Sequence, residues 1–121
     1  MGFKLGNETR KIRTPKNTPI LRKNLQGGVL AEANNDGTIF VDKSIPSGSA
    51  KEKEVVAHEG QHMDDMASGK LAYGDDYIRY NGRTFHRKNG KINYNGSWKP
   101  EGDKSFPWEK RAYKAGNAAK K

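Results

Sequence analysis

Five consecutive residues, His58-Glu59-Gly60-Gln61-His62, have side chains whose types and spacing fit metal-assisted hydrolysis. Residues four apart on a helix share a face, so His58 and His62 can place two imidazoles on one metal ion. Glu59 lies one step around the helix, within reach of a water held by that metal. This chemistry needs two neutral ligands, an open position for water and a carboxylate that takes the water's proton. The chain has three histidines and no cysteine, so any transition-metal site must use His, Asp or Glu.

The third metal ligand has to come from elsewhere in the chain. Glu109 is the preferred candidate, because Ala112 three residues later is a small side chain that permits close packing against the histidine-bearing helix. The alternative for Glu109 is a surface position in a first helical turn, where the helix dipole favours an acid. Asp75 and Asp76 are the next candidates, and they also fit turn acids in an exposed loop.

Other polar side chains fit supporting roles around the metal. Asp64 and Asp65 come directly after the motif, and one of them is a candidate to accept a hydrogen bond from a ligand imidazole. Tyr113 is a candidate catalytic residue that donates to a developing oxyanion, with packing in the core as the alternative. His86 lies in a basic stretch, which favours a paired or exposed strand histidine over a metal ligand.

The motif lies in a segment that is predicted to be a helix. Ser49 and Glu52 fit the N-cap and the third helical position of a capping box, and Gly69 is the expected stop after Ser68. Five residues of this segment recur at spacings of three and four and form one inward stripe: Val55, His58, Glu59, His62 and Met66. The two histidines are therefore predicted on the buried side of the helix.

Strands are predicted before this helix. Residues 28–45 have a hairpin pattern, with small and apolar residues in alternation, a turn at 34–37 and a β-rich run at 38–42. Residues 1–27 are basic and interrupted by prolines, so we predict an arm with little structure of its own and at most a short strand around Ile20-Leu21.

A second group of elements is predicted after the helix. Residues 70–98 have aromatic side chains at intervals and three Asn-Gly turn pairs, which favours a small curled β-meander. Residues 99–106 are predicted to be a loop. A second helix is predicted over 107–115, with Ser105 as its cap and Gly116 as its end.

Composition bounds the size of the core and the kinds of partner. With 121 residues, 32% hydrophobic and 31% charged, the chain is expected to form one domain with a modest core. The net charge of +9 favours contact with polyanions or acidic protein surfaces, and a solvated basic surface is the plainer interpretation because no nucleic-acid motif is present. The N-terminus lacks the apolar run of a signal peptide and no segment is long enough to span a bilayer, so we expect a cytoplasmic chain, or one packaged in a virion.

The hairpin, the helix and the second-helix glutamate together resemble the minimal zincin metallopeptidases in their gluzincin arrangement. In that family a first helix supplies His-Glu-x-x-His, and a later helix supplies a Glu that is commonly followed three residues on by Ala or Asp. The matching residues are His58-Glu59-Gly60-Gln61-His62 and Glu109-Lys110-Arg111-Ala112. The resemblance covers about residues 28–115. The metzincin pattern is absent, and the aspzincin pattern is not matched, although Gly74-Asp75-Asp76 leaves a variant of it open. The strand pattern at 37–42 and the small size are also similar to short peptidase-like proteins of bacteriophages.

The resemblance implies a fold and a division of the chain. We expect an α+β fold with a small antiparallel sheet packed on the motif-bearing helix, and a C-terminal helix that supplies the third ligand. Residues 28–116 would form the zincin-like domain, residues 1–27 a basic arm and residues 117–121 a basic tail.

The resemblance also implies an activity, zinc-dependent hydrolysis of peptide bonds. His58, His62 and Glu109 would bind zinc, with water as the fourth ligand. Glu59 would take the water's proton and pass it to the leaving amine. We further expect an extended peptide or protein substrate to pair with the edge of the Thr38–Val41 strand.

Two other functions fit the sequence. The chain fits a structural component of a phage particle or another assembly that keeps a zincin fold, with residues 1–27 and the tail contacting neighbouring proteins or nucleic acid. An intact Glu59 favours an enzyme over this role, because a purely structural metal site does not need that carboxylate. Nucleic-acid binding as the main function would rest on the aromatic side chains of residues 73–98.

Overall fold

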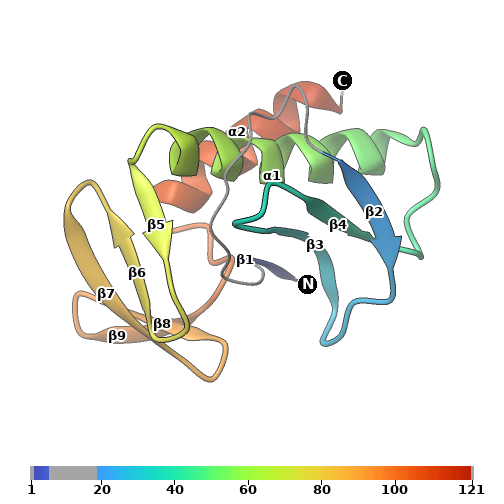
Figure 1. Cartoon of the computed structure of the whole chain (residues 1–121). Coiled ribbons are helices and arrows are strands. Elements are labelled where there is room, and N and C mark those ends of the chain that lie inside the picture. Colours follow the sequence, from blue (N-terminus) through green and yellow to red (C-terminus); the bar gives the residue numbers. More distant parts are fainter. Residues whose placement is uncertain (1, 6–18, 121) are drawn as a thin grey trace.

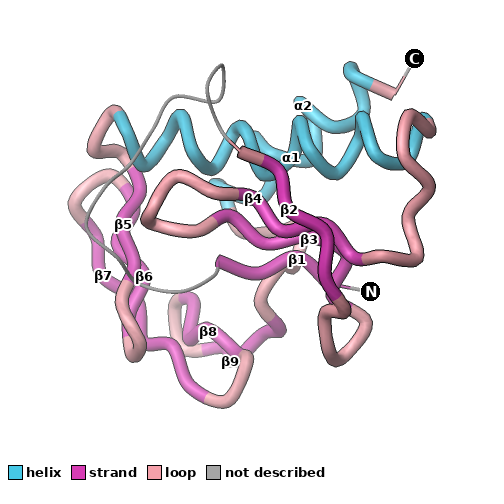
Figure 2. Tube along the Cα trace, turned by 45° about the vertical axis from the view of Figure 1, so that its right-hand side comes forward, coloured by secondary structure: helices cyan, strands magenta, loops and turns pink. Residues whose placement is uncertain are grey.

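The computed structural model describes residues 2–5 and 19–120. Its elements, in chain order, are β1 (Gly2–Leu5), β2 (Ile20–Lys23), β3 (Val29–Ala33), β4 (Ile39–Asp42), α1 (Ala50–Ala67), β5 (Leu71–Tyr73), β6 (Tyr77–Tyr80), β7 (Arg83–Lys88), β8 (Lys91–Tyr94), β9 (Ser97–Pro100) and α2 (Pro107–Ala119). The two helices run along one side of the molecule and the two sheets lie on the other side (Figures 1 and 2). The predicted α+β class is therefore confirmed. Among the described residues, neither helix combines the length and the apolar character needed to cross a membrane.

The first sheet is mixed rather than wholly antiparallel, with the strand order β1-β3-β4-β2. The predicted hairpin is confirmed, because β3 and β4 pair antiparallel with Ala31 opposite Val41. The strand predicted around Ile20-Leu21 is also confirmed as β2, which pairs parallel with β4. The sequence did not predict β1, which pairs parallel with β3 and lies within the stretch expected to form an arm. Residues 1 and 6–18 of the predicted arm lie outside the described residues.

The position of β4 corrects one expectation. Its two neighbours in the sheet are β3 and β2, so the hydrogen-bonding edges of Thr38–Val41 are already used by the chain itself. A substrate peptide cannot add to this strand in the described fold, and the prediction that it does so is wrong.

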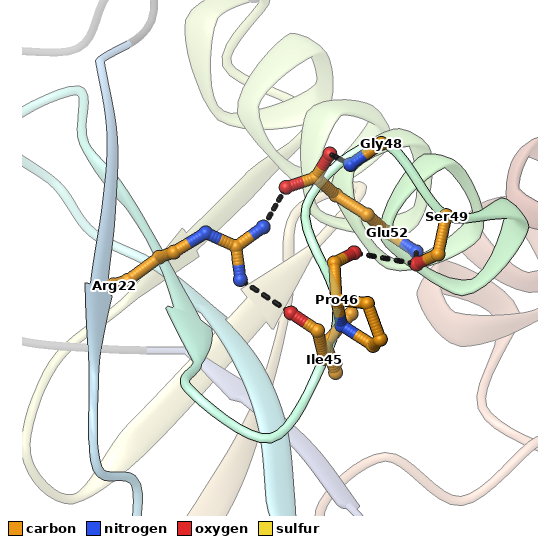
Figure 3. Close-up of polar contacts among 6 residues, drawn as sticks. All are labelled: Arg22, Ile45, Pro46, Gly48, Ser49 and Glu52. Atoms are coloured by element: carbon orange, nitrogen blue, oxygen red, sulfur yellow. Dashed lines mark hydrogen bonds and ion pairs between the residues drawn. The ribbon is translucent and has the colours of Figure 1, made fainter.

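The start of α1 is fixed by a cap and by a contact from β2 (Figure 3). Ser49 Oγ accepts the backbone N–H of Glu52 at 3.1 Å, as predicted for an N-cap. The Glu52 carboxylate does not complete a capping box on Ser49. It accepts the backbone N–H of Gly48 at 2.8 Å and pairs with the Arg22 guanidinium, which also donates to the carbonyl oxygen of Ile45. Strand β2 is thereby tied to the first turn of the helix that carries the motif.

The second sheet is the predicted meander, with neighbouring antiparallel strands in the order β5-β6-β7-β8-β9. Its three Asn-Gly turns have positive φ at both residues: Asn81 49° and Gly82 84°, Asn89 53° and Gly90 74°, Asn95 52° and Gly96 91°. Two consecutive residues with positive φ are the conformation of tight hairpin turns, which Asn-Gly adopts at low cost. The last strand reaches Pro100, so the loop predicted over residues 99–106 starts later than expected.

The core of the second sheet is aromatic and centred on Trp108 of α2, which is fully buried. Its ring stacks on Phe106 with a centroid separation of 4.9 Å and contacts three further rings, those of Tyr80, Phe85 and Tyr94. Because Trp108 directly precedes Glu109, this packing fixes the first turn of α2 and with it the direction of the Glu109 side chain.

The second helix differs from its prediction at both ends. Phe106 is its N-cap and makes no side-chain capping bond, while the Ser105 side chain bonds Asp103 instead. The helix continues through Gly116 to Ala119, so Gly116 does not end it. A glycine is needed there because a Cβ atom would lie 2.9 Å from the backbone oxygen of Glu54, where α2 meets α1.

Replacing Gly116 with alanine is therefore expected to lower the free energy of unfolding by about 1–3 kcal/mol, as overpacking does. The added Cβ would force the helices apart close to His58, whose own Cβ would lie 3.6 Å from the new methyl group. Urea unfolding measures the change, and Asn117→Ala, at the next and exposed position, is the matched control with an expected change within about 0.5 kcal/mol. Equal stability of both variants would mean that the contact between α1 and α2 accommodates the added methyl group.

Candidate metal centre

The two helices bring three metal-ligand side chains together. His58 and His62 project from α1 one turn apart, and Glu109 projects from the first turn of α2. Glu109 Oε1 lies 2.9 Å from His58 Nε2 and 3.2 Å from His62 Nε2. All three side chains can offer ligand atoms within 4.8 Å of one another, and in the described part of the chain this is the one such cluster. All three residues of the predicted ligand set are thus in one place.

The separations of these atoms fit a zinc site. Zinc bonds of about 2.0–2.2 Å in a tetrahedron hold neighbouring ligand atoms about 3.4 Å apart. The two distances to Glu109 are slightly shorter, and they also suit hydrogen bonds from both imidazoles to one carboxylate oxygen. Two imidazoles with one carboxylate are a ligand set found in three-residue zinc sites. The residues present therefore fit zinc in both type and spacing.

Glu59 lies beside this cluster and is fully buried. Neither of its carboxylate oxygens has a hydrogen-bond partner within the described residues, although a weak interaction with the backbone N–H of Ala33 favours its charged form. Burial raises the pKa of Glu59 well above its ordinary value, and the charges of Glu109 and Glu32 raise it further. Burying a polar group without a partner is costly, so this carboxylate is suited to a partner outside the polypeptide.

Two side chains of the cluster, His58 and Glu109, have shifted pKa values. Burial lowers the pKa of His58, which favours the neutral imidazole that a metal requires, while the contact with Glu109 opposes this shift. Burial also tends to raise the pKa of Glu109, but the charge of His62 and the hydrogen bonds of both imidazoles outweigh it and lower the pKa to about 2. Glu109 is therefore an ionised carboxylate at neutral pH.

An ion pair joins the two helices next to the cluster. The Arg111 guanidinium donates to both carboxylate oxygens of Asp65, at 3.2 and 3.0 Å, and Gln61 donates to the same carboxylate at 3.1 Å. The acid belongs to α1 and the guanidinium to α2, so the pair links the helix that carries His58 and His62 to the helix that carries Glu109.

This ion pair corrects the predicted role of the acids that follow the motif. Asp65 is 2% exposed and forms an ion pair with Arg111, whereas Asp64 is exposed. Neither accepts a hydrogen bond from His62, whose Nδ1 has no partner among the described residues. The inward stripe predicted for this helix did not include Asp65, and the sequence gives no sign of the arginine that covers it.

Tyr113 packs directly on the imidazole of His58. Its ring meets that of His58 edge to face with a centroid separation of 4.5 Å, and its hydroxyl donates to the carbonyl oxygen of Gly102 at 2.8 Å. Burial and the nearby carboxylates raise the pKa of Tyr113 to about 12, so it stays protonated. Tyr113 also lines a surface depression of about 500 Å³ that has three lysines in its wall: Lys104, Lys110 and Lys114. Tyr113 therefore contacts both the depression and His58.

The remaining predicted candidates lie elsewhere. Asp75 and Asp76 are exposed in the turn between β5 and β6, and His86 is exposed on β7, as expected for a strand histidine. Sequence reasoning missed Glu32 of β3, which is 9% exposed and acts on Glu59 through its charge. Side-chain alternation along β3 did not indicate that Glu32 is buried. Glu32 faces the opposite side of the strand from Ala31 and Ala33, and all three residues are buried.

Comparisons of this chain with protein families, with curated proteins and with solved structures found no match. The function must therefore be inferred from the chemistry of the site. Two imidazoles and a carboxylate can hold a divalent cation, and a second buried carboxylate beside them can accept a proton.

Proposed function

We propose that this chain is a zinc-dependent metallopeptidase with a gluzincin-like fold and site. One observation carries the proposal: His58, His62 and Glu109 converge from two helices beside the fully buried carboxylate of Glu59, whose one contact with a donor of the described residues is the weak one with Ala33. A site built only to hold a structural metal has no use for Glu59, whereas hydrolysis requires a base at that position.

The roles of the residues follow from their chemistry. His58, His62 and Glu109 would hold zinc, which would supply a Lewis acid that makes a water more acidic and polarises a peptide carbonyl. Glu59 would accept the water's proton on a carboxylate oxygen and return it to the departing nitrogen. Burial raises the pKa of Glu59, and a more basic carboxylate holds the proton that it later returns to the departing nitrogen. Tyr113 is the candidate to stabilise negative charge on the carbonyl oxygen, and its hydroxyl would have to leave Gly102 to do so.

The burial of the site favours a second candidate function. His58, His62, Glu59 and Glu109 are each at most 3% exposed, so a substrate would need a local opening to reach them. A structural protein of a phage particle or a similar assembly would need no such opening, and there the metal would only join α1 to α2.

Metal-dependent cleavage tests these alternatives. The zinc-loaded chain is incubated with a mixture of unstructured peptides, before and after treatment with a chelator, and cleavage is followed by mass spectrometry. We expect cleavage that chelation abolishes and added zinc restores. Tight zinc binding without cleavage of any peptide would support the structural function, and absence of zinc binding would overturn both.

A further inference from the structure

A second surface of the molecule, on strands that do not carry the motif, has the chemistry of a binding site. Residues 77–100, which span β6 to β9, contain no Asp or Glu, and their cations are Arg79, Arg83, Arg87, Lys88, Lys91 and Lys99. The whole chain has 14 acidic residues against 23 basic ones, so a stretch of this length without any acid is a strong local asymmetry. Strands β6 to β9 lie at the left of Figure 1, and strands β2 to β4 of the first sheet lie to their right.

The sheet separates these side chains into two faces. Ile78, Tyr80, Phe85 and Ile92 are buried and face inward, where Trp108 packs on the sheet. Because side chains alternate along a strand, the residues between them face outward. The outward side chains are Tyr77 and Arg79 on β6, Thr84, His86 and Lys88 on β7, and Lys91 and Asn93 on β8. On β9, Trp98 is opposite Asn93 and so shares the outer face.

The cations of the two faces differ in whether they have partners within the protein. On the inner side, Arg87 pairs with Glu101, and Lys99 donates to Ser105, so both serve the fold. On the outer face, Arg79, Lys88 and Lys91 are exposed and form no ion pair within the described ranges 2–5 and 19–120. The Arg79 guanidinium also lies over the Tyr77 ring, 6.0 Å from its centroid. No acid of the described residues neutralises these three charges, so they are available to an external anion.

Aromatic side chains run across the same face. Tyr77 is opposite His86 in the register of β6 and β7, and Asn93 is opposite Trp98 in that of β8 and β9. His86 and Asn93 are each next in sequence to a member of the pair Arg87–Ile92. The pair Tyr77–His86 and the pair Asn93–Trp98 therefore form one continuous row across the sheet. Trp98 is 47% exposed, which is unusual for so large an apolar ring. The row thus offers rings to stack on, with Arg79 on one side and the Lys88–Lys91 pair on the other.

We propose that the outer face of β6–β9 binds single-stranded nucleic acid. Its cations would contact phosphates, and Tyr77, His86 and Trp98 would stack on unpaired bases, which is how strand surfaces bind single strands without sequence preference. Exposed rings on an acid-free face favour this ligand over an acidic protein, which would use the charges but has no need of the rings. The proposal does not depend on the metal centre.

Fluorescence anisotropy with labelled oligothymidine and oligouridine, at low salt and across a salt series, tests the proposal. The triple variant Arg79→Glu, Lys88→Glu, Lys91→Glu is expected to raise Kd at least about 10-fold and to flatten the salt dependence, which reports the phosphate contacts. The matched control reverses three exposed lysines away from this face, Lys43→Glu, Lys53→Glu and Lys114→Glu, and should change Kd less than about 3-fold. Circular dichroism confirms that both variants are folded.

A second variant tests the stacking. Trp98→Ala is expected to raise Kd about 5- to 100-fold, and Trp98→Phe to restore most of the affinity, as loss and return of one stacked ring would do. Equal weakening by the control triple would reduce the binding to general charge attraction and overturn the proposal. Tighter binding of a poly-glutamate peptide than of either oligonucleotide would assign the face to an acidic protein instead, and no oligonucleotide binding at low salt would reject it outright.

Discussion

Replacing Glu59 with glutamine is expected to lower kcat for peptide cleavage by about 10²–10⁴-fold, the usual contribution of a general acid–base residue. Glutamine fills the same fully buried space but cannot accept a proton from water. The zinc content should be unchanged, because the proposed ligands are His58, His62 and Glu109. Initial rates of peptide cleavage and metal analysis of the same protein samples measure the two quantities.

The matched control is Asp64→Asn, which makes the same chemical change on α1 at an exposed position. It should leave both the cleavage rate and the zinc content as in the wild type. Undiminished cleavage by the Glu59→Gln variant would reject Glu59 as the base. If cleavage and zinc were lost together, Glu59 would have a part in holding the metal.

The parts of the site that could be predicted are those that depend on local sequence. The spacing of His58 and His62 fixes their common helix face, and the Ser49 cap with Gly69 after the helix fixes its ends. The position of Glu109 depends on how α2 packs on α1, which local sequence does not determine. Its direction comes from the burial of Trp108, and nothing in the spacing of the sequence indicates that contact.

The parts that could not be predicted depend on contacts between distant segments. Strands β1 and β2 join the first sheet by parallel pairing, which requires the chain to cross over rather than turn back, and no short turn pattern indicates such pairing. Gly116 has the ordinary appearance of a helix stop, and only the nearness of the Glu54 backbone explains a glycine inside the helix. Asp65 is buried because Arg111 reaches it from the other helix.

Loss of Glu109, the proposed third ligand, is expected to cause a large decrease in zinc affinity. Glu109→Ala removes the one ligand that we propose on α2, and should weaken zinc binding by more than the roughly 10- to 100-fold that loss of an outer-shell partner costs. Glu109→Gln, which preserves the volume of the buried side chain but removes its charge, should also weaken it. Titration of the metal-free chain against a zinc-binding dye measures both affinities.

Asp75→Ala and Asp76→Ala are the controls, because these acids are the alternative ligands and the structure places them in an exposed turn. Neither should change zinc affinity, since in the described part of the chain the histidines meet only Glu109 as a third ligand. Thermal unfolding of each metal-free variant separates loss of a ligand from loss of the fold. Zinc should raise the unfolding temperature of the wild type and both controls, because it binds the folded state, and should fail to do so for Glu109→Ala. Equal zinc affinity in Glu109→Ala and the wild type would mean that α2 does not supply a ligand, and the metal would then have to be held by α1 with another acid.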